Sequence, residues 1–94
     1  MDLSDWRARI DTVDRILLDL INRRLEYAEE IGQIKRAHGR EVRDEGRERE
    51  VIEGLTAQNG GPLTAAAVAD IFNRIMAEAR QLEGGDVDRR NRRA

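Results

Sequence analysis

KRAHGREVRDEGRE, residues 35–48, ends one helical pattern, crosses a Gly-containing break and begins a second helical pattern. Four charged residues within it stand at positions that continue the apolar stripes of the two helical patterns. They are Lys35, Asp44, Arg47 and Glu48. Burying such charges without a purpose is costly. The stretch therefore predicts a corner between two helices and one half of a polar site.

Residues 2–37, upstream of this corner, predict a single long helix that Asp2 or Ser4 can cap. Apolar residues recur there at steps of three and four, and neither Pro nor a turn cluster interrupts them. A helix of about 34 residues is ~50 Å long. Because this is too long for the core of a 94-residue chain, we expect the helix to pack against something outside its own chain.

Two shorter helices are predicted downstream of the corner. The first begins near residues 42–44, ends near Gln58 and carries the stripe Val51, Ile52 and Leu55. The turn Asn-Gly-Gly-Pro, residues 59–62, separates it from a helix over about 64–83 that Thr64 can cap. The sequence thus predicts an all-α domain of three helices over residues 1–85, without strands, and a disordered basic tail over residues 86–94.

Composition excludes several classes of protein. The chain has no Cys and one His, His38, which excludes disulfides and most zinc arrangements. A net charge of −2 does not fit a protein that coats nucleic acid. No apolar run approaches the length that spans a membrane, and no signal peptide is visible. We therefore expect a cytoplasmic protein that binds neither nucleic acid nor membrane.

Charged residues at inward positions of all three predicted helices indicate a ligand site. Each of them alone fits an exposed side chain whose charged end reaches water. Together they predict a polar pocket inside a helical bundle. Three cations stand against two or three acids, and an excess of Arg and Lys over the acids committed to the site predicts an anionic ligand, since guanidinium groups bind carboxylates in a fork. The set comprises Arg24, Lys35, Asp44, Arg47, Glu48 and Glu83.

Arg7 can join such a site only from another chain. It lies about 42 Å from Lys35 along the axis of the long helix, so the two side chains of one chain cannot touch the same small ligand. If Arg7 contributes to the site, it comes from a second subunit that lies antiparallel across the long helix.

Most of the chain resembles one family. The segments WRARIDTVDRILLDLINRRLEYAEEIGQIKRAHGREVRDEGRERE, from Trp6, and NGGPLTAAAVADIFNRIMAEARQLE, from Asn59, resemble the all-helical (AroQ-type) chorismate mutases. The resemblance covers residues 3 to about 83. The spacing of Arg7, Arg24 and Lys35, followed by an R-D-x-x-R-E element, carries it. The Asn-Gly-Gly-Pro turn is most similar to mutase domains fused to heptulosonate-phosphate synthases.

The resemblance implies an intertwined six-helix homodimer that rearranges chorismate to prephenate, without a metal, another cofactor or a covalent intermediate, in phenylalanine and tyrosine biosynthesis. It also implies two active sites, each completed by Arg7 of the other subunit. The implied roles are carboxylate binding by Arg7 and Arg24, contact with the ether oxygen and a carboxylate by Lys35, binding near the ring hydroxyl by Asp44 and Glu48, and support of the substrate by Arg47.

The chain departs from the family pattern at two candidate substrate-binding positions. Glu83 stands where many members have a Gln that donates to the ether oxygen, and Ala79 stands where a Ser is common. With Glu83 as a catalytic residue, the resemblance predicts activity that falls as pH rises, because only a protonated carboxyl can donate a hydrogen bond.

Two alternatives to the mutase remain open. The related isochorismate-pyruvate lyases share the fold and site, and a helical dimerisation or regulatory module would need no activity. A further shikimate-pathway enzyme is a possible partner.

Overall fold

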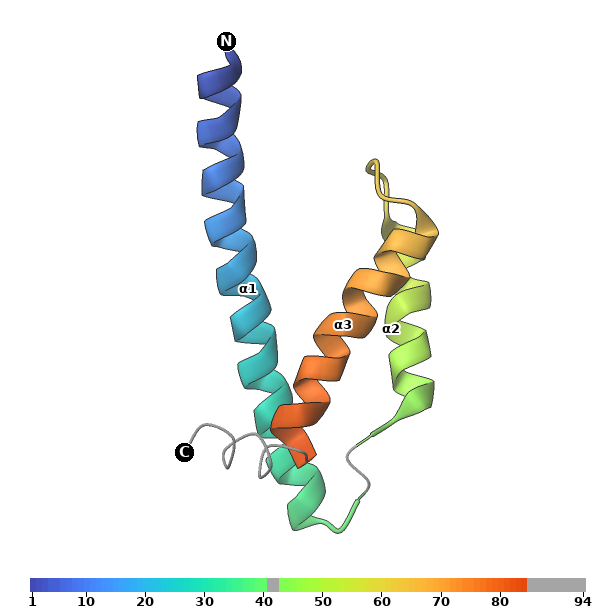
Figure 1. The fold of residues 1–94 in the computed structure, drawn as a ribbon. Helices are drawn as coiled ribbons and strands as arrows, with labels where there is room; N and C mark the ends of the chain where they lie inside the picture. The colour runs from blue at the N-terminus through green and yellow to red at the C-terminus, as the bar shows by residue number, and fades with distance from the viewer. Residues whose placement is uncertain (41–42, 85–94) are drawn as a thin grey trace.

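The computed structural model describes residues 1–40 and 43–84 and contains three α-helices and no strand over this part of the chain (Figure 1). The helices are α1, Leu3–Ala37, α2, Glu45–Gln58, and α3, Ala65–Gly84. The all-α prediction is therefore confirmed, while the predicted disordered tail, residues 86–94, lies outside the described residues. None of the described helices is long and apolar enough to cross a membrane.

Local capping explains where α1 begins and ends. The Asp2 side chain accepts a hydrogen bond from the backbone N–H of Asp5 at 3.0 Å, and the Asp5 side chain accepts from the backbone N–H of Asp2 at 3.0 Å. At the other end Gly39 has φ of 66°, a left-handed conformation that glycine adopts without steric cost. The predicted break after the long helix is therefore confirmed.

Side-chain caps begin both later helices, and of the two caps Thr64 was predicted. The backbone N–H of Arg47 donates to the Asp44 carboxylate at 3.0 Å, and the backbone N–H of Ala67 donates to the Thr64 hydroxyl at 3.1 Å. Between α2 and α3, the Asn59 side chain donates to the carbonyl of Leu63 at 2.8 Å and stabilises the turn. Asp44 is therefore both a helix cap and a candidate site residue.

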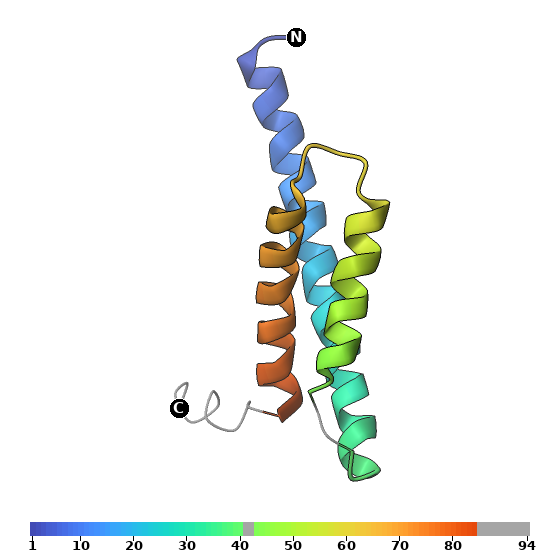
Figure 2. The same ribbon diagram turned by 90° about the vertical axis from the view of Figure 1, so that its right-hand side faces the viewer.

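Helix α3 packs against both α1 and α2, and its C-terminal end meets the C-terminal half of α1 (Figures 1 and 2). Gly32 makes this close approach possible, because a Cβ atom at its position would lie 2.8 Å from Cγ and 3.0 Å from Cα of Glu83. The buried apolar residues of the described chain are few: Ala28, Val68, Met76 and Ala79.

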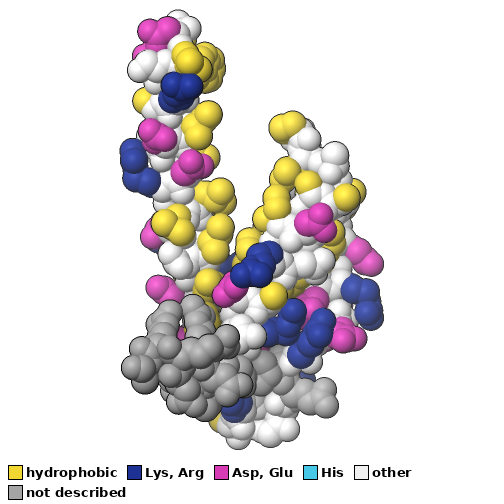
Figure 3. Space-filling view, in the orientation of Figure 1, with side chains coloured by type: hydrophobic (Ala, Val, Ile, Leu, Met, Phe, Trp, Pro, Cys, Tyr) yellow, Lys and Arg dark blue, Asp and Glu magenta, His cyan; other side chains and the backbone are white. Residues whose placement is uncertain are grey.

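The N-terminal half of α1 stands away from the other helices (Figure 1). Hydrophobic side chains follow it along the edge that faces α3, and others line α3 (Figure 3). These side chains of α1 are 51–63% exposed, and such a continuous apolar surface is typical of an interaction site. The exposed set comprises Leu3, Trp6, Ile10, Val13, Ile16, Leu17 and Leu20.

Candidate active site

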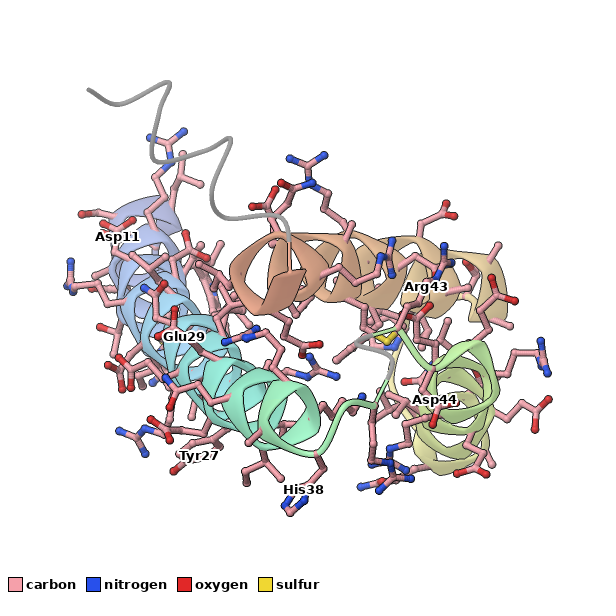
Figure 4. All side chains as sticks on the ribbon, turned by 90° about the horizontal axis from the view of Figure 1, so that it is seen from below. Asp11, Tyr27, Glu29, His38, Arg43 and Asp44 are labelled. Atoms are coloured by element: carbon pink, nitrogen blue, oxygen red, sulfur yellow. The ribbon has the colours of Figure 1, made fainter. Side chains whose placement is uncertain are left out.

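A pocket of about 290 Å³ lies between the C-terminal half of α1, the first turns of α2 and the C-terminal half of α3. Figure 4 looks along the bundle from this end and shows Arg43 and Asp44 at the beginning of α2. The volume is at the lower end of the roughly 300–1,000 Å³ that small-molecule sites occupy. Its apolar lining consists of Tyr27, Ala28, Ile31, Val51, Met76 and Ala79.

Charged side chains from all three helices line the same pocket. The structure brings together all of the predicted site residues except Arg7, and it adds one cation that the sequence reasoning missed. Within residues 1–40 and 43–84, no group of three or more Asp, Glu or His side chains is arranged to hold a metal ion. The charged lining comprises Arg24, Lys35, Asp44, Arg47, Glu48, Arg80 and Glu83.

Helix α1 contributes Arg24 and Lys35, which are both half-buried. Their spacing of eleven residues gives them nearly the same direction, so both reach the pocket from different heights on one helix. Arg7 is exposed near the beginning of the same helix, beside Asp11 and far from the pocket. A ligand in this pocket therefore meets Arg24 and Lys35, but not Arg7, of the same chain.

At the beginning of α2, Asp44 and Arg47 form an exposed edge of the pocket. The Asp44 carboxylate is engaged by the backbone N–H of Arg47. The guanidinium of Arg47 lies 3.6 Å from the carboxylate of Glu50, and its side chain is 67% exposed. Because a surface ion pair of this kind is weak, the Arg47 side chain is able to exchange Glu50 for an anionic ligand.

Glu48 is the more enclosed acid of α2, and it bridges α2 to α3. Its carboxylate accepts a hydrogen bond from Arg80 Nη1 at 2.8 Å and lies 3.5 Å from Arg43 Nη2. The sequence reasoning missed Arg80. Helical spacing contained the signal, because Met76, Ala79, Arg80 and Glu83 follow one another at i, i+3, i+4 and i+7 and so share one face of α3.

Glu83, near the end of α3, is 9% exposed and lies against Gly32 of α1. Burial raises the pKa of its carboxyl above the ordinary value of 4.5, while the positive charges of Lys35, Arg36 and Arg24 lower it. The negative charge of Glu48 raises the pKa further. Since the net shift is upward, Glu83 holds its proton at a higher pH than an exposed carboxyl would.

Two longer proteins are similar to this chain over most of its length. The chain is 33% identical over 79 residues to the T-protein of Haemophilus influenzae and 38% identical over 81 residues to a bifunctional chorismate mutase/prephenate dehydratase of Neisseria gonorrhoeae. These matches cover 82% and 86% of this chain, but only 21% and 22% of the two relatives. The chain therefore corresponds to about a fifth of each of these longer proteins.

Solved structures match over nearly their whole length. The chorismate mutase of Thermus thermophilus (form II) is 31% identical with a TM-score of 0.84, covering 86% of this chain and 92% of that one. The chorismate mutase of Helicobacter pylori in complex with prephenate is 26% identical with a TM-score of 0.81, covering 92% and 93%. The model of the family described as chorismate mutase type II matches residues 6–84. The chain therefore belongs to the chorismate mutase type II family.

Proposed function

We propose that the pocket binds chorismate and catalyses its Claisen rearrangement to prephenate, within phenylalanine and tyrosine biosynthesis. The observation that carries the proposal is the gathering of Arg24, Lys35, Arg47 and Glu48 from two helices around one small pocket in a chain of this family. The excess of cations over carboxylates in the lining suits a substrate with two carboxylates.

The proposed reaction is unimolecular, so the site has no proton to transfer and no nucleophile to activate. The enzyme must hold the folded, reactive conformer and stabilise the negative charge that develops on the ether oxygen as the C–O bond stretches. In the proposed arrangement Arg24 binds a carboxylate and Lys35 meets the ether oxygen and a carboxylate. The reaction requires no cofactor, so side-chain placement supplies the catalysis.

The remaining pocket residues have proposed roles at the other side of the substrate. Asp44 and Glu48 bind near the ring hydroxyl, and Arg47 supports the substrate from the exposed edge of the pocket. Glu83 replaces the usual Gln as a donor to the ether oxygen when its carboxyl is protonated. Ala79 contributes only an apolar surface, since it has no hydroxyl to offer to a carboxylate.

We further propose that the active protein is an intertwined homodimer of six helices in which Arg7 reaches the pocket of the other subunit. The exposed apolar edge of α1 supports this assembly, because its side chains are half or more exposed in the single chain. Arg7 lies about 42 Å along α1 from Lys35. An antiparallel pair of α1 helices would bring the N-terminal half of each beside the C-terminal half of the other.

The direct test adds chorismate to the purified protein and follows its disappearance together with the formation of prephenate. The same preparation is tested with isochorismate for release of pyruvate. Prephenate from chorismate supports the mutase. Pyruvate from isochorismate without prephenate formation supports the lyase, and a folded dimer that acts on neither substrate supports the dimerisation or regulatory module.

Three wider expectations accompany the mutase proposal. We expect the protein to act in the cytoplasm and to be able to bind another shikimate-pathway enzyme. The likeness of its Asn-Gly-Gly-Pro turn to mutase domains fused to heptulosonate-phosphate synthases stays a prediction, as do its place in the cell and its partners.

A further inference from the structure

The contact between Arg80 and Glu48 is an ion pair that links two helices. It joins α3 to α2 at 2.8 Å across 32 residues of sequence. Both side chains line the pocket, and they are only 30% and 18% exposed. A charge-assisted hydrogen bond in such a partly enclosed position is stronger than the same bond in open solvent.

We propose that Arg80 is a positioning residue of the mutase, which holds the Glu48 carboxylate in place for the substrate and supplies positive charge that the pocket needs. This inference rests on the proposed function and deepens it. Glu48 extends from the first turn of α2, and α2 has no fully buried residue to fix it against α3. The Arg80 guanidinium is therefore an anchor that α2 otherwise lacks on this side of the pocket.

The balance of charge gives Arg80 its second role. The pocket lining contains four cationic side chains and three carboxylates, of which Glu83 is one. Without Arg80 the cationic side chains and the carboxylates of the lining would be equal in number. A dianion would then meet no net positive charge from this subunit when Glu83 is ionised. Arg80 thus offsets the acid that the chain carries at position 83, three residues further along the same face of α3.

Arg43 cannot take over these roles. Its side chain is 54% exposed, it lies 3.5 Å from Glu48, and it also lies 3.8 Å from Glu45. A pair in this setting is screened by solvent and contributes little. Arg80 is therefore the partner that fixes Glu48, and Arg43 is an outer, replaceable contact.

The test compares Arg80→Met and Arg80→Lys with the control Arg74→Met, which removes an exposed ion pair to Glu78 on the same helix outside the pocket. We expect Arg80→Met to lower kcat/KM for chorismate by roughly 10- to 100-fold, as loss of a hydrogen bond between charged groups does, through both a lower kcat and a higher KM. Arg80→Lys should restore KM, because it keeps the charge, but not kcat, because it lacks the planar fork. Arg74→Met should stay within about 2-fold of the wild type.

Two further measurements separate positioning from a merely structural link. Prephenate binding measured by calorimetry should weaken in Arg80→Met and recover in Arg80→Lys. In a Glu48→Gln background, Arg80→Met should no longer lower kcat, because no carboxylate remains for the guanidinium to hold. Thermal unfolding of each variant shows whether it is folded at the assay temperature. If Arg80→Met does not fold, the kcat of Arg80→Lys is the measurement that decides.

The possible failures are distinguishable. A wild-type protein that neither converts chorismate nor binds prephenate overturns the proposed function and this inference with it. An active wild type together with a folded Arg80→Met that keeps kcat and KM within 2-fold overturns the role of Arg80 alone. A full kcat in Arg80→Lys contradicts the positioning of Glu48 by the guanidinium fork.

Discussion

The two halves of α1 follow the same apolar pattern but have different surroundings. The C-terminal half packs against α3, buries Ala28 and Gly32 and turns Arg24 and Lys35 into the pocket. The N-terminal half leaves its apolar stripe half or more exposed and carries Arg7 away from the pocket. Helical periodicity therefore identifies an inward face without identifying which chain will cover it.

The largest effect is expected in the C-terminal half, where neighbouring arginines provide a matched pair. Arg24 lines the pocket, whereas Arg23 is 54% exposed and pairs with Asp19 at 3.2 Å. We expect Arg24→Ala to lower kcat/KM for chorismate by about 10²- to 10³-fold, as loss of one preorganised donor does. Arg23→Ala should change it by less than about 2-fold. Equal losses in the two variants would show that the pocket has been assigned to the wrong face of α1.

A substitution in the N-terminal half tests whether its apolar stripe is covered. Ile10 is 57% exposed in the single chain, and Thr12 lies on another face of the same turns. We expect Ile10→Glu to raise the Kd of the dimer by at least about 100-fold, because each dimer loses two buried Ile side chains of roughly 1.5–3 kcal/mol. Thr12→Glu should leave the Kd nearly unchanged. Sedimentation over a dilution series measures both, and an Ile10→Glu dimer as tight as the wild type would mean that this stripe faces water.

The pH dependence of the rate tests the acid at the meeting point of α1 and α3. Burial raises the pKa of Glu83 despite the nearby charges of Lys35, Arg36 and Arg24, with Glu48 raising it further. In the proposed mechanism the protonated carboxyl donates to the ether oxygen below this raised pKa, and the carboxylate would repel the developing charge above it. We therefore expect kcat to fall as pH rises through the pKa of Glu83, by about 10-fold or more.

The variant Glu83→Gln provides the control for this profile, because an amide donates at every pH and should flatten the curve. The contribution of Glu83 to the stability of the folded state should also fall as pH rises. A native pKa above the unfolded value means that the folded state binds the proton more tightly, so its contribution is complete below about 4.5 and is lost as pH rises through the native pKa. A wild-type rate that is constant between mildly acidic and neutral pH would contradict the role of Glu83.

The smallest effects are expected at two helical glycines, and they have opposite signs. A Cβ at Gly32 would lie within 3.0 Å of the Glu83 backbone, whereas a Cβ at Gly54 of α2 would meet no atom within 4 Å. We expect Gly32→Ala to lower the free energy of unfolding by about 1–2 kcal/mol through overpacking, and Gly54→Ala to raise it by about 0.5–1 kcal/mol. Denaturant unfolding measures both. A stabilising Gly32→Ala would show that α1 and α3 are not in close contact.

Local signals predicted the helices well. Asp2, Asp44 and Thr64 cap helices through side-chain contacts that span three residues, and Gly39 ends α1 through its own backbone conformation. These features depend on neighbours in sequence, so the sequence contains them directly. The shared direction of Arg24 and Lys35 follows in the same way from the geometry of one helix.

Contacts between helices were harder to predict. Helical phase placed Glu48 on an inward face, but its contact with Arg80 depends on how α3 lies against α2. Gly32 lies against Glu83, 51 residues later, and this contact follows only from the crossing of α1 and α3. The contribution of Arg7 depends on a second chain, and so it stays a prediction.

The measurement that tests the shared site most directly mixes two inactive variants, Arg7→Ala and Arg24→Ala. In a mixed dimer one pocket would contain Arg24 of the first variant and Arg7 of the second, so it would be intact, while the other pocket would lack both. Random exchange makes half of the dimers mixed, and each mixed dimer has one intact pocket of two, so we expect recovery of about a quarter of wild-type activity. If the subunits exchange, as shown by mixed dimers of differently tagged variants, and no activity returns, the two halves of α1 do not build one site across the dimer.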